Sequence, residues 1–268
     1  WGVTESQHLV DVVNQTDLVE RTDGEAKLGQ AMVQFTLIEN LGTLDLYILP
    51  WFRKRTFPGQ DGRLRPPVAI LSDATYGMEN AERHLSFAGR WLRTINAFDV
   101  GLSHFWGTSR DPILVFTQRG EFQPHYDRIH QSGLEFQAIA AGWLMKLEAI
   151  HRTGQGSRFA AATAGFEYTF GNVRSSGADV GLLLEYLWDE RSEGFSAFED
   201  DFFLGTRFAL NDVQSSDVLA GAIIDRSSGS TAFLFEASRR VGENWKIEAE
   251  ARGFLVAKNA ADPFHAIR

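Results

Sequence analysis

The amino-acid sequence predicts an all-β fold: a transmembrane antiparallel β-barrel of about fourteen to sixteen strands when complete, with a short N-terminal plug-like segment. Three observations lead to this prediction. Apolar and polar residues alternate through most of the chain after residue 27, and a period of two places them on opposite faces of a strand. Most alternating segments run roughly 9 to 13 residues, whereas soluble strands average about 5–6. Aromatic residues gather near segment ends, as at Trp106, Trp143 and Trp188, where a membrane interface would lie.

The composition narrows the class of protein. The 268 residues include no cysteine, which excludes disulfides, thiol nucleophiles and thiolate metal ligands. The net charge of −9, from 26 basic and 35 acidic residues, argues against nucleic acid as a partner, because phosphate binding needs a basic surface. No apolar run approaches the ~20 residues of a membrane-spanning helix. The sequence opens on Trp1-Gly2 without a signal peptide, so we expect a mature or truncated piece.

Two parts of the chain are expected to differ in structure. Residues 1–27 are the least strand-like and carry turn residues such as Thr16-Asp17, so they are interpreted as a plug or a periplasmic or lumenal segment. Residues 28–268 are interpreted as the barrel, with one or more terminal strands missing. Alternation begins at residue 28, turns at 40–42 and returns through 44–50. A long excursion, 53–80, is rich in Pro, Gly and charge, and loops of this length are usually functional.

The remaining segments follow as hairpins. We expect strands at 83–94 and 98–106, a further strand at 112–119, and a second excursion at 120–132. A hairpin over 134–152 should turn at Ala141-Gly142. Strands at 158–170, 180–188, 202–211 and 218–225 lead to a closing hairpin at 231–258. In its second arm Trp245 and Ile247 fall on one face, and Lys246 and Glu248 on the other. The count is about thirteen, and bacterial single-chain barrels have even numbers.

Several short motifs resemble a family of proteobacterial outer-membrane barrels, porin-like and of uncharacterised function. They are Trp1-Gly2-Val3-Thr4-Glu5-Ser6, Val12-Val13-Asn14-Gln15-Thr16-Asp17-Leu18, Leu49-Pro50-Trp51-Phe52-Arg53 and Phe208-Ala209-Leu210-Asn211-Asp212, together with the charged closing hairpin. Gln15 stands where the family pattern has proline. The resemblance spans most of the chain and implies a channel or transport-associated barrel. It implies no substrate and no catalytic residue.

The alternation also predicts which charged residues would line a lumen. They carry both signs of charge and are Lys146, Glu148, Arg152, Glu167, Glu185, Arg207, Glu236, Arg240, Lys246, Glu248, Glu250 and Arg252. Such a wall could sort solutes by charge. Alternatively, these residues pair across strands and only fill the lumen.

Basic residues concentrate in the first long excursion of this otherwise acidic chain. They are Arg53, Lys54, Arg55, Arg63 and Arg65. Arginine pairs with phosphate or carboxylate in a forked geometry, so this patch could face lipopolysaccharide or another anion. The alternative is a solvated loop whose cations meet acidic residues of the lumen.

Other chemistry is weakly indicated. His125, Asp127 and His130 are metal-ligand types within six residues, but nothing in the pattern converges them, and no metal or cofactor is predicted. Ser103 and His104 are neighbours that point to opposite faces of a strand, and no Gly-x-Ser-x-Gly motif is present. We therefore predict a non-enzyme.

The sequence thus predicts a porin-like passive transporter in the bacterial outer membrane, with lipid bilayer and lipopolysaccharide as its surroundings. Small solutes would diffuse through a polar lumen narrowed by residues 1–27 and 53–80. The alternatives are a scaffold barrel that holds a partner protein and, third, an outer-membrane enzyme. The transported solute and a homo-oligomeric state stay open.

Overall fold

The structure is a computed structural model that describes residues 1–20, 26–59, 61–62, 66–191, 196 and 198–255. Strands dominate these residues, and the helical turns among them are the short 3₁₀ turns η1 (Ala81–Arg83) and η2 (Val173–Ser175). Within the described chain, no helix has the length and apolar character needed to cross a membrane. The predicted all-β class is confirmed.

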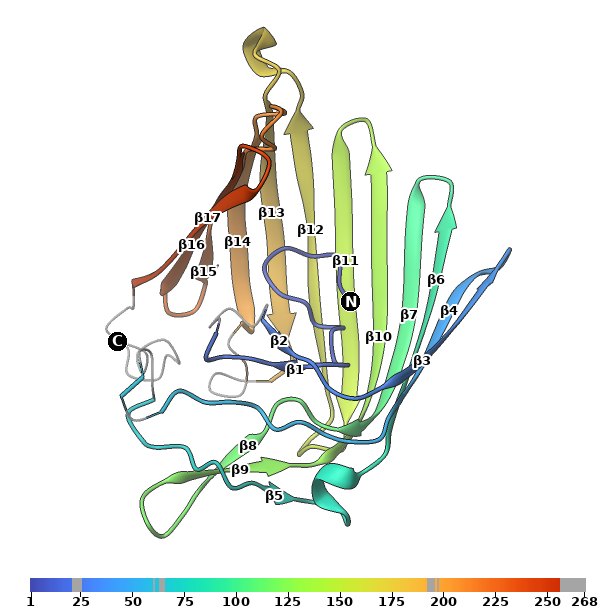
Figure 1. The fold of residues 1–268 in the computed structure, drawn as a ribbon, viewed down its shortest axis with the longest axis vertical. Coiled ribbons are helices and arrows are strands. Elements are labelled where there is room, and N and C mark those ends of the chain that lie inside the picture. Colours follow the sequence, from blue (N-terminus) through green and yellow to red (C-terminus); the bar gives the residue numbers. More distant parts are fainter. Residues whose placement is uncertain (21–25, 60, 63–65, 192–195, 197, 256–268) are drawn as a thin grey trace.

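One twelve-stranded antiparallel sheet makes up most of the molecule (Figure 1). The strands lie side by side in the same order as they occur in the chain, so the sheet is an up-and-down meander. Its strands, in order, are β3 (Val33–Glu39), β4 (Gly42–Leu49), β6 (Ser86–Ile95), β7 (Phe98–Thr108), β10 (Arg128–Ala140), β11 (Trp143–Thr153), β12 (Phe159–Phe170), β13 (Asp179–Asp189), β14 (Asp200–Ala209), β15 (Asp217–Asp225), β16 (Thr231–Val241) and β17 (Trp245–Leu255).

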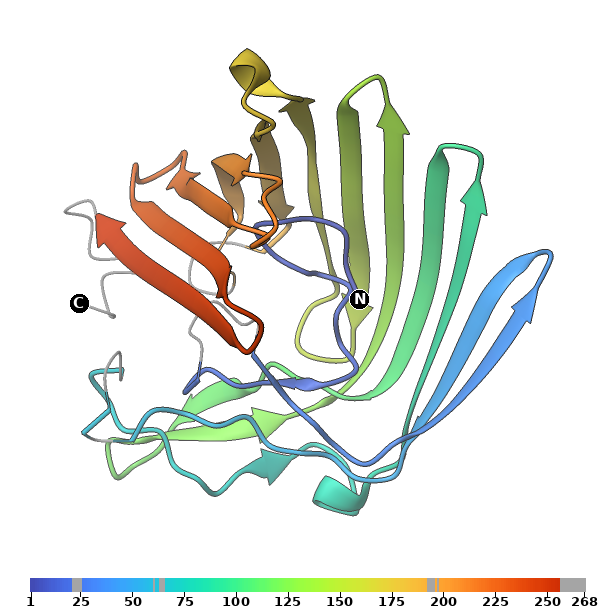
Figure 2. The same ribbon diagram turned by 45° about the horizontal axis from the view of Figure 1, so that its top comes forward.

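The sheet curves strongly but is not closed in the described residues. Strands β3 and β17 are its two edges, and each pairs on one side only. Figure 2 shows the strands bending around the N-terminal segment, with β3 and β17 at the two ends of the arc. The predicted large antiparallel sheet is therefore present, whereas the closed ring of a barrel is not formed by the described strands. The end of the predicted closing hairpin, 256–258, and the remainder of the predicted barrel region, 259–268, lie outside the described residues.

Short turns join the strands at one end of the sheet, as the alternation predicts. Strand β10 ends at Ala140 and β11 begins at Trp143. The two residues between them, Ala141 and Gly142, have φ values of 49° and 85°. Positive φ at both central positions is the geometry of a tight two-residue hairpin turn, whose twist matches that of the flanking strands.

The strand predicted at 112–119 is confirmed at Ile113–Phe116 but lies outside the main sheet, and the excursion predicted at 120–132 is wrong. Residues Ile113–Phe116 do form a strand, β8, but it belongs to a separate three-stranded sheet with β9 (Phe122–Tyr126) and β5 (Thr75–Tyr76). The excursion predicted at 120–132 instead contains β9 and the start of β10. The pattern hides β10 because Gln131, which lies on the same face as the buried Ile129, is itself buried and polar. A second small sheet pairs β1 (Gln15–Thr16) with β2 (Lys27–Leu28).

The two faces of the main sheet differ in chemistry. On the outer face, large apolar side chains are solvent-exposed, among them Trp245 at 75% and Phe235 at 40%. Cross-strand aromatic pairs such as Trp143 with Tyr168, whose ring centroids are 4.7 Å apart, run along this face and contribute about 0.5–1.5 kcal/mol each. On the inner face, Glu148 and Glu185 are buried. Alternation within each strand thus separates an apolar surface from a charged one.

Candidate functional site

The inner face of the main sheet is covered by the N-terminal segment, residues 1–20. Figures 1 and 2 show this segment looping within the curve of the sheet, in front of β10 to β13. Its apolar residues Val12 and Val13 join a buried cluster with Phe105 and Ile129 from the sheet. Val10 packs in a second buried cluster, with Ile150 and Phe159. The segment is therefore part of the packed interior, and its polar groups need partners there.

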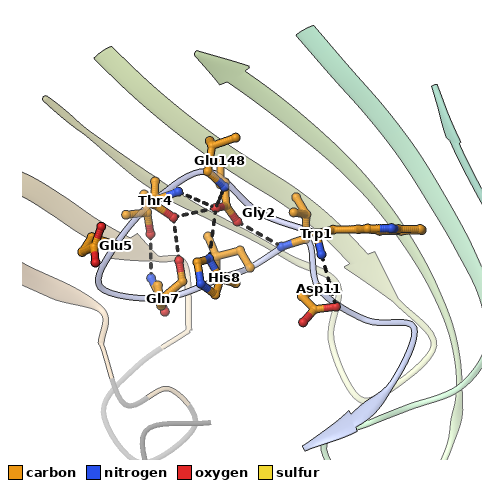
Figure 3. Close-up of polar contacts among 12 residues, drawn as sticks. Trp1, Gly2, Thr4, Glu5, Gln7, His8, Asp11 and Glu148 are labelled. Carbon is orange, nitrogen blue, oxygen red and sulfur yellow. Dashed lines mark hydrogen bonds and ion pairs between the residues drawn. The ribbon is translucent and has the colours of Figure 1, made fainter. Parts of the chain in front are cut away.

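Glu148 on β11 is the main anchor of the segment (Figure 3). Its Oε1 accepts hydrogen bonds from the backbone N–H of Val3 at 2.6 Å and of Thr4 at 2.9 Å, and from the Thr4 hydroxyl at 2.6 Å. Its Oε2 accepts one from the N–H of Val10 at 3.3 Å. His8 Nδ1 lies 3.7 Å from Oε1, and the proximity of this carboxylate raises the pKa of His8 above 6.5. The ring of donors compensates a carboxylate that is fully buried.

Two further glutamates repeat this arrangement. Glu185 on β13 accepts hydrogen bonds from the N–H of Glu5 at 2.7 Å, the N–H of Ser6 at 2.8 Å and the Ser6 hydroxyl at 2.6 Å. Glu135 on β10 accepts one from the N–H of Gly2 at 3.0 Å while Arg90 holds it in a bidentate pair at 2.6 and 2.7 Å. Three buried carboxylates of the wall thus bind the backbone of residues 2–10.

The backbone of Gly2 is shaped for this contact. Its φ is 125°, a conformation that L side chains rarely adopt. A Cβ at this position would lie 2.6 Å from His8 Nδ1 and 3.0 Å from Glu148 Oε1. Glycine therefore lets the segment approach the Glu148 carboxylate closely.

Side chains of the segment also pair with cations of the wall. Glu5 Oε2 accepts a hydrogen bond from Arg207 at 2.7 Å and lies 3.6 Å from Lys146 Nζ. Arg207 in turn lies 3.7 Å from Glu167. The predicted lumenal residues Lys146, Glu148, Glu167, Glu185 and Arg207 therefore belong to one polar network that includes the segment.

The other predicted lumenal residues lie apart from that network. Arg152 donates to Gln131 at 2.8 Å and to Asp111 at 3.0 Å. Arg252 pairs with Glu236 across β16 and β17 at 2.5 Å. Lys246 pairs with Glu248 two residues away at 2.6 Å, on an exposed part of β17. Arg240 and Glu250 are also exposed, and stand opposite Lys246 and Glu236 in the strand register.

In the basic excursion, the cationic side chains that the structure describes bind to other groups of this chain. Arg53 donates to the carbonyl of Gly29 at 2.9 Å, Lys54 pairs with Glu82 at 3.2 Å, and Arg55 pairs with Asp111 at 2.6 Å. Arg63 and Arg65 lie outside the described residues. Arg53, Lys54 and Arg55 thus contact acceptors of the chain.

The histidines of the predicted second excursion do not converge. His125 lies 3.2 Å from Asp127, while His130 lies on β10, with its ring 5.9 Å from that of His104. Across the residues that the structure describes, no cluster of three or more His, Asp or Glu side chains could hold a metal ion.

A chamber remains beside the N-terminal segment. It has a volume of about 780 Å³, and its walls come from the segment, the excursion at 53–80, the loop after β7 and the inner faces of β15 to β17. Arg110, in the loop after β7, lines this chamber. Its guanidinium lies 5.3 Å from the ring centroid of Phe52 and 5.0 Å from that of Phe105. Burial lowers the pKa of Arg110 to about 9, so it stays charged at neutral pH.

Several of these residues escape prediction from the sequence. Glu135, Arg90 and Gln131 lie on strands whose inner faces look mixed, and Arg110 lies in a short loop with no pattern of its own. The inner face is also partly apolar: Leu183, Leu187, Phe203, Leu219 and Ile223 form a buried cluster. Gly205 and Gly221 make room for Phe203, because a Cβ on either would lie 2.8 Å or less from its ring. Two glycines on neighbouring strands beside one aromatic residue are a sequence signal from which the packing around Phe203 could have been predicted.

Comparison with protein-family models, curated proteins and solved structures finds no match to this chain. Its function is therefore inferred from the geometry of the sheet, the segment and the chamber.

Proposed function

We propose that this protein is a porin-like β-barrel of the bacterial outer membrane that lets small solutes diffuse passively through a polar lumen. Residues 1–20 act as a resident plug that narrows the lumen, together with the excursion at 53–80. The strands cross the bilayer with their apolar face toward lipid. Closure of the ring requires strands, or an edge pairing, beyond those that the structure describes.

The observation that carries this proposal is the exposed apolar face. On the outer face, every strand of the main sheet except β10 and β15 bears at least one large apolar side chain that is at least 36% exposed. Soluble monomers rarely expose apolar patches beyond about 300–600 Å². A surface that extends over nearly the whole sheet needs an apolar medium, and lipid supplies it.

The charged residues of the inner face support the proposal that this face lines a lumen and does not contact lipid. Glutamates, lysines and arginines alternate with the apolar residues on the same strands, as at Lys146, Glu148 and Arg152 on β11. In hydrocarbon, unpaired charges of this kind are costly. Here they are paired with each other or bound to the plug, as expected for the interior of a barrel.

Two measurements test the proposal. Protein extracted in detergent should be β-rich by circular dichroism and should migrate faster on a gel before boiling than after it. In planar bilayers it should conduct ions, and deletion of residues 1–12 should increase the conductance. Reversal of charge at Arg252, on the inner face, should change ion selectivity, whereas reversal at Arg83, in η1, should not.

Other outcomes would redirect the assignment. A protein that is soluble without detergent and shows no mobility shift would rule out the membrane barrel. A heat-shifted barrel that never conducts, even without residues 1–12, and that co-purifies with another protein would favour a scaffold instead.

A further inference from the structure

The chamber beside the plug has an apolar wall, which a simple aqueous pore does not need. Leu219 and Ile223 of β15 line it, together with Leu234 of β16 and Phe254 of β17. Leu219 and Ile223 are buried in the inner-face cluster, and the partly buried Leu234 packs on that cluster. Apolar side chains facing a lumen favour contact with an apolar molecule over water. This wall would therefore hold a hydrocarbon group.

Another part of the chamber lining carries an excess of positive charge. Arg55, Arg110 and Arg152 line the chamber, and so does Asp111. Asp111 pairs with Arg55 at 2.6 Å and with Arg152 at 3.0 Å, so one carboxylate is shared between two guanidiniums. We call Arg55, Arg110 and Arg152 the arginine cluster.

Arg110 adds a further positive charge to this cluster. Arg110 is 4% exposed, and its guanidinium donates to the carbonyls of Val12, Val13 and Thr108 at 2.8 to 3.2 Å. These acceptors are neutral, and within the described chain Arg110 forms no ion pair. Asp111 attracts Arg110 electrostatically, but a buried cation without a directly bonded anion is still costly, and an anion in the chamber would relieve that cost. Counted with Asp111, the three arginines carry a formal charge of +2, whereas the rest of the chamber lining carries three cations (Lys27, Arg191 and Arg252) and four carboxylates (Glu5, Asp11, Asp189 and Glu236).

We infer that the chamber binds an amphipathic anion, a solute with a carboxylate or phosphate group at one end and a hydrocarbon tail. The arginine cluster receives the anionic group, since guanidinium pairs with such oxyanions in a forked geometry. The wall of β15 to β17 receives the tail. At about 780 Å³, the chamber lies within the range of about 300–1,000 Å³ that is typical of ligand sites. This inference rests on the proposed function and names the class of solute that the barrel would admit.

The test uses octanoate as the probe and the full chain in lipid nanodiscs, with empty nanodiscs as the blank for partition into lipid. Equilibrium dialysis of labelled octanoate should give saturable binding. Acetate, which has the charge without the tail, and octanol, which has the tail without the charge, should each bind at least roughly tenfold more weakly. Acetate as tight as octanoate would overturn the role of the apolar wall, and octanol as tight would overturn that of the arginine cluster.

Two variants and two matched controls locate the site. Arg55→Gln should weaken octanoate binding roughly tenfold, and Leu234→Gln should weaken it by a similar factor. Arg226→Gln is the control for Arg55→Gln, because Arg226, like Arg55, pairs with one aspartate, Asp200 at 2.8 Å. Arg226 does not line the chamber, so this variant should bind octanoate as the wild type does. Val213→Gln, at a turn residue that is 94% exposed, is the control for Leu234→Gln. Equal loss in a variant and its control would contradict the assignment.

Conductance measured on the same samples separates this inference from the proposed function. Conductance without saturable octanoate binding would overturn the amphipathic-anion site and leave the channel standing. Octanoate binding to a protein that neither conducts nor shows a heat-dependent mobility shift would support the site and overturn the channel.

Discussion

Thr4 and Glu148 are 144 residues apart in the chain, yet both the backbone N–H and the hydroxyl of Thr4 donate to one oxygen of the Glu148 carboxylate. The donor lies on the N-terminal segment and the acceptor on the wall of the sheet. This pair therefore anchors the N-terminal segment to the main sheet.

Removing the charge of Glu148 should release the plug. In Glu148→Gln the donors of Val3, Thr4 and Val10 lose a charged acceptor, and loss of one partner of a buried charged network costs about 3–5 kcal/mol. Hydrogen exchange followed by mass spectrometry should show much faster exchange in residues 3–10. Glu39→Gln, at the exposed end of β3, is the control. Unchanged protection in Glu148→Gln would mean that the segment is held by its apolar contacts alone.

Substitution of Gly2 should weaken the same contact through the backbone. Gly2→Ala must adopt a φ of 125° and place a Cβ against His8 and Glu148, and strain of this kind costs about 1–3 kcal/mol. Gly29→Ala is the matched control, because nothing lies within 4 Å of a Cβ there and its φ is not positive. Proteolysis of the N-terminal segment under native conditions should accelerate in the first variant only.

The attachment of the plug should depend on pH through His8. Its pKa is raised above 6.5, mainly by the neighbouring Glu148 carboxylate. The contribution of protonated His8 is thus fully present below pH 6.5 and is lost as the pH rises through the raised value. The difference in melting temperature between the wild type and His8→Gln should be largest at acidic pH and should vanish at alkaline pH. A difference that grows with pH would contradict this sign.

A charge on the outer face should oppose insertion into lipid. Leu204 lies near the middle of β14 and is 49% exposed. Leu204→Lys should destabilise the folded protein in bilayers by about 2–4 kcal/mol, the cost of a cation near the bilayer midplane. Ser238→Lys, on the inner face of β16, where the native hydroxyl bonds Asp217 at 2.7 Å, should cost much less. Denaturant titration in liposomes measures both. Equal costs would mean that the two faces meet similar media.

Local patterns in the sequence predict the strands of the main sheet and the two-faced character of each. Alternation is a local property, so Trp245 and Lys246 can be assigned to opposite faces without knowledge of the partners. The same argument places Glu148 and Glu185 on the inner face but cannot say what they bind. Their partners, Thr4 and Ser6, lie on a segment without regular structure, more than 140 residues away.

The prediction fails where a strand breaks the expected alternation. β9 and the start of β10 mix histidine, glutamine and arginine with buried apolar residues such as Tyr126 and Ile129, so they resemble a loop. Likewise, Leu219 and Ile223 look like ordinary strand residues in the sequence, because alternation does not reveal that both faces of β15 are apolar. The chamber wall follows only from the register that sets β15 beside Phe203 and Leu234.

The meander has a consequence for the order of assembly. Apart from β4 with β6 and β7 with β10, which are joined by long excursions, strands that pair in the main sheet are close in sequence. Most of the sheet can therefore grow one hairpin at a time with little loop-closure entropy lost at each step. Residues 2–6, by contrast, bond to groups 133 to 202 positions later. Their binding sites do not exist until β10 to β14 are in place. The first residues of the chain are therefore among the last to find their native positions, and refolding should show a slow late phase confined to them.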